Sequence, residues 1–238
     1  MKECGRVLGV IPARGGSKGI PRKNLLQLGG KTLIQIAIES AQGSKSLDET
    51  LVSTDDEEIA SVAESVGGWV PFRRPDTLAK DDSSTYSVAR HAVEWIEHEQ
   101  GCQVDIVVIL PPTTPFRTSE HIDATLALLK TTAADAALTV TEPDYPPSWM
   151  YSMSADGGLT CLISGGNTVT RRQDTPRYHQ PAGSVYALRR KSLFEIKGVL
   201  PYGDTRGYPV GQRDAINIDT PLQFALAEAM YVAGDPCR

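Results

Sequence analysis

The chain has 238 residues, of which 40% are hydrophobic and 22% charged, and its formal net charge is −5. This length and apolar content suit one globular domain with a sizeable core. The acidic balance disfavours nucleic acid and anionic membranes as partners, since both would repel it. We therefore expect a small-molecule ligand, and an anionic ligand would need a local cluster of basic residues.

The apolar runs and the cysteines of the sequence bear on where the protein is found. The sequence has no apolar run of the roughly 18 residues that span a membrane, and Arg14 interrupts the short apolar stretch near its start. The four cysteines are scattered without a C-x-x-C pair, which disfavours a zinc site or a disulfide framework. These features predict a cytoplasmic protein.

Strand-like apolar runs alternate with segments of helical spacing along most of the chain. The predicted strands span 7–12, 50–53, 69–72, 105–110, 136–140 and 184–188. The predicted helices span 32–42, 55–66, 83–97, 119–130 and 221–232, with N-caps at Ser119 and Thr220. This alternation predicts an α/β fold whose mostly parallel sheet is covered by helices on both faces. Ligands of such sheets bind beyond the carboxyl ends of the strands.

Residues 142–180 break the alternation. They are rich in proline and glycine and contain no long periodic segment. We interpret them as an irregular insertion or hairpin arm within a single domain that spans residues 1–238.

The loop after the first strand carries the strongest chemical signal. Residues 13–24 read ARGGSKGIPRKN, so that three glycines are interleaved with four cations, Arg14, Lys18, Arg22 and Lys23. Backbone N–H groups of such a loop can cradle phosphate oxygens, and long cationic side chains can stabilise charge on a departing pyrophosphate. A solvated basic turn is the alternative, but the position directly after a strand favours phosphate binding.

Two common nucleotide motifs are absent. The loop has no G-x-G-x-x-G pattern. Gly30-Lys31-Thr32 looks like the end of a P-loop, but Leu25 stands where the first glycine of that motif would be. Gly29 and Gly30 are therefore interpreted as a turn that enters a helix.

The opening segment IPARGGSKGIPRKNLLQLGGKTL resembles the first motif of the acylneuraminate (CMP-sialic acid) cytidylyltransferase family. Further matches follow in order along the chain: LVSTDD at 51–56, RPDTLAKDDSST at 74–85, His91-Ala92, PTTPFR at 112–117, RRQ at 171–173 and IDT at 218–220. The resemblance implies a Rossmann-like α/β/α nucleotidyltransferase fold. It also implies a homodimer in which 142–180 is an exchanged dimerisation arm, and transfer of CMP from CTP to a small anionic acceptor.

The resemblance also implies roles for individual residues. The catalytic set would be Arg14, Lys18 and Lys23. CTP would be bound by Ala13, Gly15, Gly16, Ser17, Asn24, Arg74, Asp81, Ser83 and Thr113. The acceptor would be bound by Arg117, Arg171, Arg172, Gln173, His179 and Tyr186. Mg²⁺, or Mn²⁺ in its place, would be held by Asp219 and Asn217. As alternatives, Asp81 and Asp219 could each cap the helix that follows it.

Three positions depart from the family pattern. Pro111 and Ala182 stand where the family usually has Gln and Asn, and Asn217 stands where it often has Asp. Loss of two amides from the acceptor side suggests a changed acceptor, because an unmatched buried polar group costs roughly 1–3 kcal/mol. Asn217 keeps a carbonyl oxygen that can bind Mg²⁺.

The sequence leaves the acceptor and the class of protein open. The first expectation for the acceptor is a sialic-acid-like 2-keto-3-deoxy sugar acid, such as a pseudaminic- or legionaminic-type sugar, and the alternative is a small phosphonate. Two rivals to a CMP-transferring enzyme are a non-catalytic nucleotide-binding regulatory domain and a sugar-1-phosphate nucleotidyltransferase.

Overall fold

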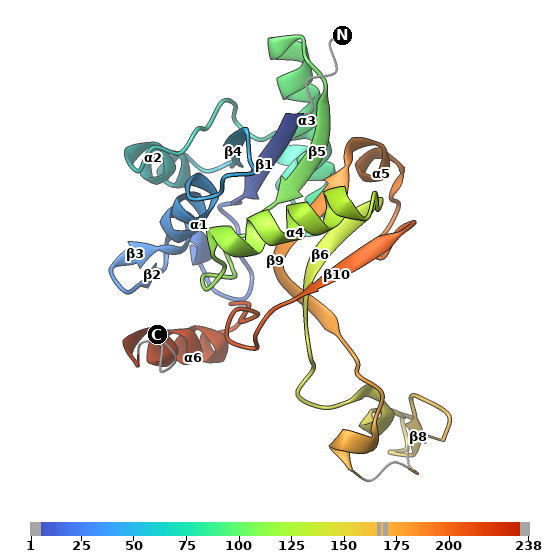
Figure 1. Cartoon of the computed structure of the whole chain (residues 1–238). Helices are drawn as coiled ribbons and strands as arrows, with labels where there is room; N and C mark the ends of the chain where they lie inside the picture. Colours follow the sequence, from blue (N-terminus) through green and yellow to red (C-terminus); the bar gives the residue numbers. More distant parts are fainter. Residues whose placement is uncertain (1–5, 166–167, 169–170, 234–238) are drawn as a thin grey trace.

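The computed structural model describes residues 6–165, 168 and 171–233, and its centre is a six-stranded sheet with the order β10-β6-β9-β5-β1-β4 (Figure 1). The strands are β1 (Arg6–Pro12), β4 (Glu49–Ser53), β5 (Val104–Ile109), β6 (Ala136–Thr141), β9 (Gln180–Arg189) and β10 (Thr205–Pro209). β1 pairs in parallel with β4 and β5, and β10 pairs in parallel with β6. β9 runs antiparallel between β5 and β6. The predicted α/β fold with a mostly parallel sheet is confirmed.

Helices cover both faces of this sheet. α1 (Leu33–Gln42), α2 (Glu57–Ser65) and α4 (Ser119–Thr131) pack on one face, and α3 (Thr85–Gln100) and α5 (Arg190–Glu195) on the other. The run of apolar residues in β1 after Arg6 follows from burial on both faces. Val7 and Ile11 enter the core under α1, α2 and α4, while Leu8 and Val10 enter the core under α3 and α5. Burying each such side chain stabilises the fold by about 1.5–3 kcal/mol.

Two predicted boundaries are wrong for identifiable reasons. Residues 69–72 form no strand but touch the β4 edge through isolated bridges, Leu51 to Trp69 and Thr54 to Arg73. Pro71 lies between these bridges and has no N–H to continue a ladder. The N-cap of α4 is Thr118, which forms a capping box with His121, and not Ser119.

Several elements escaped the sequence analysis because they are short or polar. α5 has 6 residues, and the edge strand β10 reads TRGYP. Gly29 and Gly30, both at positive φ, turn a hairpin between β2 (Gln27–Leu28) and β3 (Lys31–Thr32) just before α1. α6 (Pro221–Val232) begins where predicted, with Thr220 as N-cap. None of the described helices is long and apolar enough to cross a membrane.

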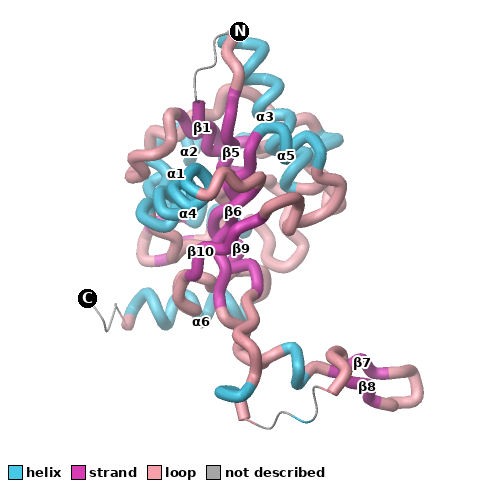
Figure 2. The backbone as a smooth tube through the Cα atoms, turned by 45° about the vertical axis from the view of Figure 1, so that its right-hand side comes forward, coloured by secondary structure: helices cyan, strands magenta, loops and turns pink. Residues whose placement is uncertain are grey.

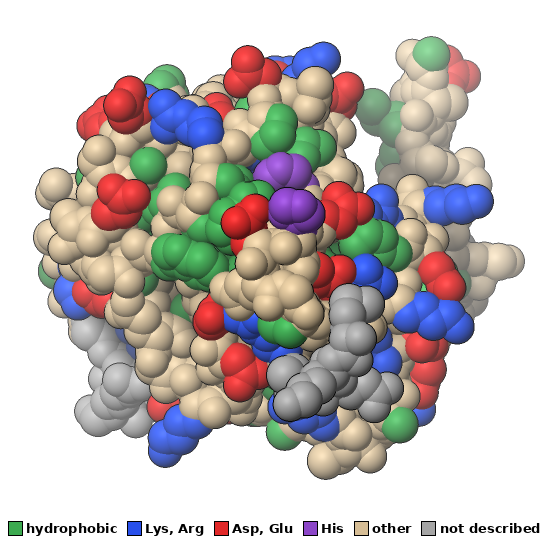
Figure 3. Space-filling model, turned by 90° about the horizontal axis from the view of Figure 1, so that it is seen from above, with side chains coloured by type: hydrophobic (Ala, Val, Ile, Leu, Met, Phe, Trp, Pro, Cys, Tyr) green, Lys and Arg blue, Asp and Glu red, His purple; other side chains and the backbone are tan. Residues whose placement is uncertain are grey.

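Between β6 and β9 the chain leaves the body as a projecting arm (Figure 2). Its described elements are the 3₁₀ turns η3 (Pro147–Trp149) and η5 (Arg172–Asp174) and a hairpin of β7 (Tyr151–Met153) and β8 (Leu159–Cys161). Apolar side chains of this hairpin are exposed, with Met153 73% and Leu159 63% accessible. On the face of the body seen in Figure 3, by contrast, acidic and basic side chains are interspersed.

Candidate active site

A pocket of about 460 Å³ opens beyond the carboxyl ends of β1 and β5. Its walls bring together segments that are far apart in the sequence, as expected for a site at this edge of a parallel sheet. Ten of the predicted site residues line it: Arg14, Ser17, Lys18, Lys23, Asn24, Arg74, Asp81, Ser83, Thr113 and Asp219.

The loop of residues 13–24 is anchored from several sides. The backbone N–H of Ala13 donates to the Ser53 carbonyl at 2.9 Å, and that of Gly15 donates to Asp55 Oδ1 at 3.1 Å. The Asn24 side chain donates to the Arg14 carbonyl at 2.9 Å. A Cβ on Gly19 would lie 2.1 Å from the Asp219 carbonyl oxygen, so only glycine allows this approach. Ala13, Gly15 and Gly16 do not line the pocket themselves, and Ala13 is fully buried.

Three cations of the pocket, Arg14, Lys18 and Lys23, are paired with its carboxylates. Asp81 Oδ2 accepts from Lys18 Nζ at 2.7 Å, and its Oδ1 lies 3.1 Å from Arg14 Nη1. The hydrogen bond from Lys18 lowers the pKa of the Asp81 carboxyl. Lys23 Nζ lies 2.7 Å from Asp219 Oδ1. Because such exposed pairs are weak, an incoming triphosphate can take over the cations.

The structure excludes a helix-capping role for Asp81 and places Arg22 outside the pocket. Asp81 does not cap α3, since Ser84 does so by accepting from the Ser87 N–H. Arg22 does not line the pocket and instead pairs with Asp56, the N-cap residue of α2, and with Glu58 of its first turn.

Arg74 supplies a fixed cation in the wall of the pocket. It is only 3% exposed, its Nε donates to Ser53 Oγ at 3.1 Å, and its Nη2 donates to the Ser53 carbonyl. Burial lowers the pKa of the guanidinium to about 10, so it stays charged at neutral pH. Its anchored position makes it a wall residue and not a mobile phosphate ligand.

Asn217 and Asp219 form the candidate metal pair. The Asn217 amide nitrogen donates to Asp219 Oδ2 at 2.5 Å, while its Oδ1 is buried without a hydrogen-bond partner among the described residues. Thr220 caps α6, so the Asp219 carboxylate is not needed for that task. A carboxylate and a free amide oxygen suit Mg²⁺, which commonly binds one or two protein carboxylates together with substrate phosphates. No group of three His, Cys, Asp or Glu suited to a metal occurs among the described residues.

A second hollow of about 600 Å³ continues from this pocket and shares Ser83, Thr85, Pro111 and Thr113 with it. The predicted acceptor residue Tyr186 lines it, and burial raises the pKa of this tyrosine. Several apolar residues of this wall could not be recognised from the sequence, because apolar residues of strands, helices and loops look like ordinary core. They are Tyr86, Ile109, Leu138, Pro181, Val199 and Leu200.

The sequence profile of the family described as Cytidylyltransferase matches residues 8–201 of this chain. The chain belongs to this family. It is 34% identical over 227 residues to the CMP-N,N'-diacetyllegionaminic acid synthase of Legionella pneumophila, covering 94% of this chain and 96% of that protein. It is 32% identical over 223 residues to a pseudaminic acid cytidylyltransferase of Campylobacter jejuni, covering 93% and 94%.

Solved structures agree on the fold of this cytidylyltransferase. CMP:2-keto-3-deoxy-manno-octonic acid synthetase complexed with CTP superimposes with a TM-score of 0.70 over 96% of this chain and 99% of that one. At 21% identity this likeness concerns the fold alone. The family match and the named relatives identify the protein as a CTP-dependent nucleotidyltransferase, and the structural likeness supports the predicted Rossmann-like architecture.

Arg117 of this cytidylyltransferase is not at the mouth of the site. It is 4% exposed, and its Nη1 donates to the carbonyls of Pro111 at 2.8 Å and Ser184 at 3.0 Å. Its Nε donates to Ser40 Oγ at 3.2 Å. Burial lowers its pKa to about 9. The prediction that it contacts the acceptor is wrong: it ties the loop after β5 to β9.

The predicted acceptor residues of the arm also lie apart from the pocket within one chain. Arg171, Gln173 and His179 are exposed and line neither the nucleotide pocket nor the hollow beside it. Gln173 borders a separate hollow at the base of the arm. Arg172 begins η5, but its side chain lies outside the described ones. Within one chain, none of the described side chains among these residues contributes to either space.

Proposed function

We propose that this cytidylyltransferase transfers CMP from CTP to a sialic-acid-like 2-keto-3-deoxy sugar acid and releases pyrophosphate. The observation that carries the proposal is the pocket itself, in which ten predicted residues from separate segments meet beside a second, more apolar hollow. Relatives that match over more than nine-tenths of the chain are named for legionaminic and pseudaminic acids. They do not favour a phosphonate acceptor or a non-catalytic domain.

The pocket residues suit in-line displacement at the α-phosphorus. The acceptor hydroxyl loses its proton to water as its oxygen forms a bond to that phosphorus, while the bond to pyrophosphate breaks. Arg14, Lys18 and Lys23 would leave their carboxylates and bind the β- and γ-phosphates, where negative charge grows. Arg74 and Ser83 would line the end of the pocket that holds the nucleoside.

We propose Mg²⁺ as the cofactor. Asp219 and the Asn217 Oδ1 would hold it, and a bound Mg²⁺ neutralises charge on the phosphate oxygens. Differential scanning fluorimetry with CTP, with and without Mg²⁺, tests this: the ion should increase the stabilisation by CTP in the wild type but not in Asp219→Ala.

We also propose a homodimer, placed in the cytoplasm where CTP is available. The exposed apolar side chains of the arm, among them Tyr151, Met153 and Leu159, would be covered by a second copy. Sedimentation velocity of the wild type and of a Met153→Glu, Leu159→Glu variant would measure this. A monomeric wild type at micromolar concentration would refute the dimer.

The function is tested by pyrophosphate release with CTP, Mg²⁺ and a panel of acceptors. The panel contains N,N'-diacetyllegionaminic acid, pseudaminic acid, N-acetylneuraminic acid, 2-keto-3-deoxyoctonic acid and 2-aminoethylphosphonate. We expect turnover with at least one nine-carbon sugar acid and confirm the product by mass spectrometry. Turnover with the phosphonate alone would overturn the proposed acceptor class.

A further inference from the structure

A third hollow, of about 600 Å³, lies between β9 and α6. It shares Pro181, Gly183, Tyr186 and Asn217 with the apolar hollow next to the nucleotide pocket. Asn217 in turn donates to Asp219, which lines the nucleotide pocket. The three spaces therefore meet at the Asn217–Asp219 pair.

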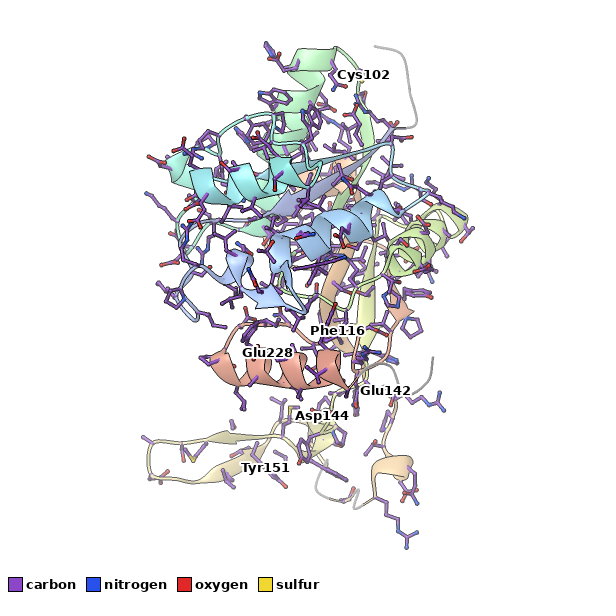
Figure 4. The ribbon with its side chains drawn as sticks, turned by 90° about the vertical axis from the view of Figure 1, so that its left-hand side faces the viewer. Cys102, Phe116, Glu142, Asp144, Tyr151 and Glu228 are labelled. Atoms are coloured by element: carbon purple, nitrogen blue, oxygen red, sulfur yellow. The ribbon has the colours of Figure 1, made fainter. Side chains whose placement is uncertain are left out.

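The charges around this junction are uneven. Neither the apolar hollow nor the third hollow is lined by a lysine, and Arg213 is the only arginine lining them among the described residues. Glu142 and Asp144, at the root of the arm (Figure 4), also line the third hollow, and Asp144 accepts a hydrogen bond from Gln212, the residue before Arg213. Among the described residues, Arg213 is therefore the cationic side chain with which an acid in these two hollows can pair.

Arg213 is held in place by an aromatic ring. Its guanidinium carbon lies 5.1 Å from the centre of the Phe116 ring. Phe116 packs in a small core with Leu28, Leu33 and Ile218, next to α6 (Figure 4). Stacking on a packed ring fixes the plane of a guanidinium, which is the arrangement that binds a carboxylate by two parallel hydrogen bonds.

The chemistry of the acceptor places its carboxylate at this same point. In the ring form of a 2-keto sugar acid, the attacking hydroxyl and the carboxylate are on one carbon atom. If the hydroxyl meets the α-phosphorus beside Asp219, the carboxylate must lie beside the junction of the three spaces. The remaining ring substituents then extend into the apolar hollow of Leu138, Val199 and Leu200.

We infer that Arg213 binds the carboxylate of the acceptor, with Phe116 positioning its guanidinium. This inference rests on the proposed function and assigns to the chain's own body a contact that the sequence resemblance places on the arm. It makes Arg213 a residue that distinguishes an acid from a neutral sugar.

The test is steady-state kinetics of Arg213→Gln and Arg213→Lys with CTP and the best sugar acid. Loss of a charge-assisted contact of about 1.5–3 kcal/mol predicts that Arg213→Gln raises the acceptor KM roughly 10- to 100-fold. Arg213→Lys should fall between that variant and the wild type, because lysine cannot form the two parallel bonds. The Kd of CTP, measured by calorimetry without acceptor, should stay within about two-fold.

Two controls separate carboxylate binding from a general defect. Arg206→Gln removes an exposed arginine of β10 that pairs with Asp204 and lines none of the three spaces, and it should leave both constants unchanged. The carboxamide analogue of the acceptor should be poor with the wild type and no poorer with Arg213→Gln.

The inference is overturned if Arg213→Gln keeps a wild-type acceptor KM, or if it impairs the acid and the carboxamide equally. A raised KM in Arg171→Gln or Arg172→Gln, with Arg213→Gln unaffected, would place the carboxylate on the arm. If the wild type transfers CMP to no sugar acid at all, the proposed function falls first and this inference falls with it.

Discussion

The nucleotide pocket and the acceptor hollow beside it differ in how they are built. The nucleotide pocket is formed largely by charged and polar residues of the 13–24 loop and three further segments, and three of its cations, Arg14, Lys18 and Lys23, are paired with carboxylates. The acceptor hollow is formed largely by aliphatic residues such as Leu138 and Leu200. A protein that binds a triphosphate needs cationic groups to balance its charge. An organic acceptor can be contacted by apolar surfaces of many different shapes and sequences.

The largest expected effect is on the chemistry of the nucleotide pocket. Lys18→Ala and Asp219→Ala should each lower kcat by about 10²–10³, since each removes a contact to charge that grows during the reaction. Lys31→Ala and Asp204→Ala remove the same residue types from ion pairs outside the pocket and should retain wild-type turnover. Activity within a few-fold of wild type in Lys18→Ala or Asp219→Ala would reject the role of that residue.

A second prediction concerns the connection between the two halves. Arg117 holds the carbonyls of Pro111 and Ser184, and Pro111 borders both spaces. Arg117→Met should lower the free energy of unfolding by about 2–4 kcal/mol, because buried acceptors lose their donor. Urea denaturation followed by circular dichroism measures this, with Arg206→Met as the control. An unchanged midpoint would contradict the structural role.

A third prediction tests the selectivity of the nucleotide pocket. CTP should bind roughly 10- to 100-fold more tightly than UTP, ATP or GTP, because a site built to hydrogen-bond one base leaves polar groups unpaired with another. Thermal shifts with each nucleotide and Mg²⁺ provide the comparison. Equal stabilisation by all four would show that the pocket reads phosphates and not the base.

The smallest expected effect lies in the acceptor hollow. Pro111 borders this space and has no side-chain amide, so hydroxyl-rich N-acetylneuraminic acid should be the poorer acceptor by roughly ten-fold in kcat/KM against a less hydroxylated nine-carbon acid. Pro111→Gln should narrow the gap. If N-acetylneuraminic acid is the best acceptor of the wild type, Pro111 and Ala182 do not determine specificity.

The sequence allowed prediction of the elements whose signals are local. The β5 strand appeared as an uninterrupted apolar run, and α6 appeared from its Thr-Pro start. The phosphate loop appeared because glycine and cations alternate there. The interior position of Arg117 could not be predicted, because it depends on the approach of β9 and the loop after β5, two segments far apart in the chain.

The acceptor side was harder to predict for a related reason. Val199 and Leu200 follow α5, a helix too short to show periodicity, and nothing in their immediate neighbours distinguishes a pocket wall from a core. The role inferred for Arg213 depends on its contact with Phe116, which lies far from it in the sequence and is brought near it only by folding. Cations interleaved with glycine within one segment indicate a phosphate-binding loop. A single arginine has no local sequence pattern that indicates a binding role.

The contact of Gly19 with the Asp219 carbonyl has a consequence for the order of events during protein synthesis. The ribosome synthesises the loop before the segment of Asp219, against which Gly19 rests. A nascent chain that still lacks this segment contains the phosphate-binding residues of the loop but not the Asp219 backbone against which Gly19 packs. The nucleotide pocket can therefore be completed only after Asp219 has been synthesised, and chains that stop before Asp219 lack part of its wall.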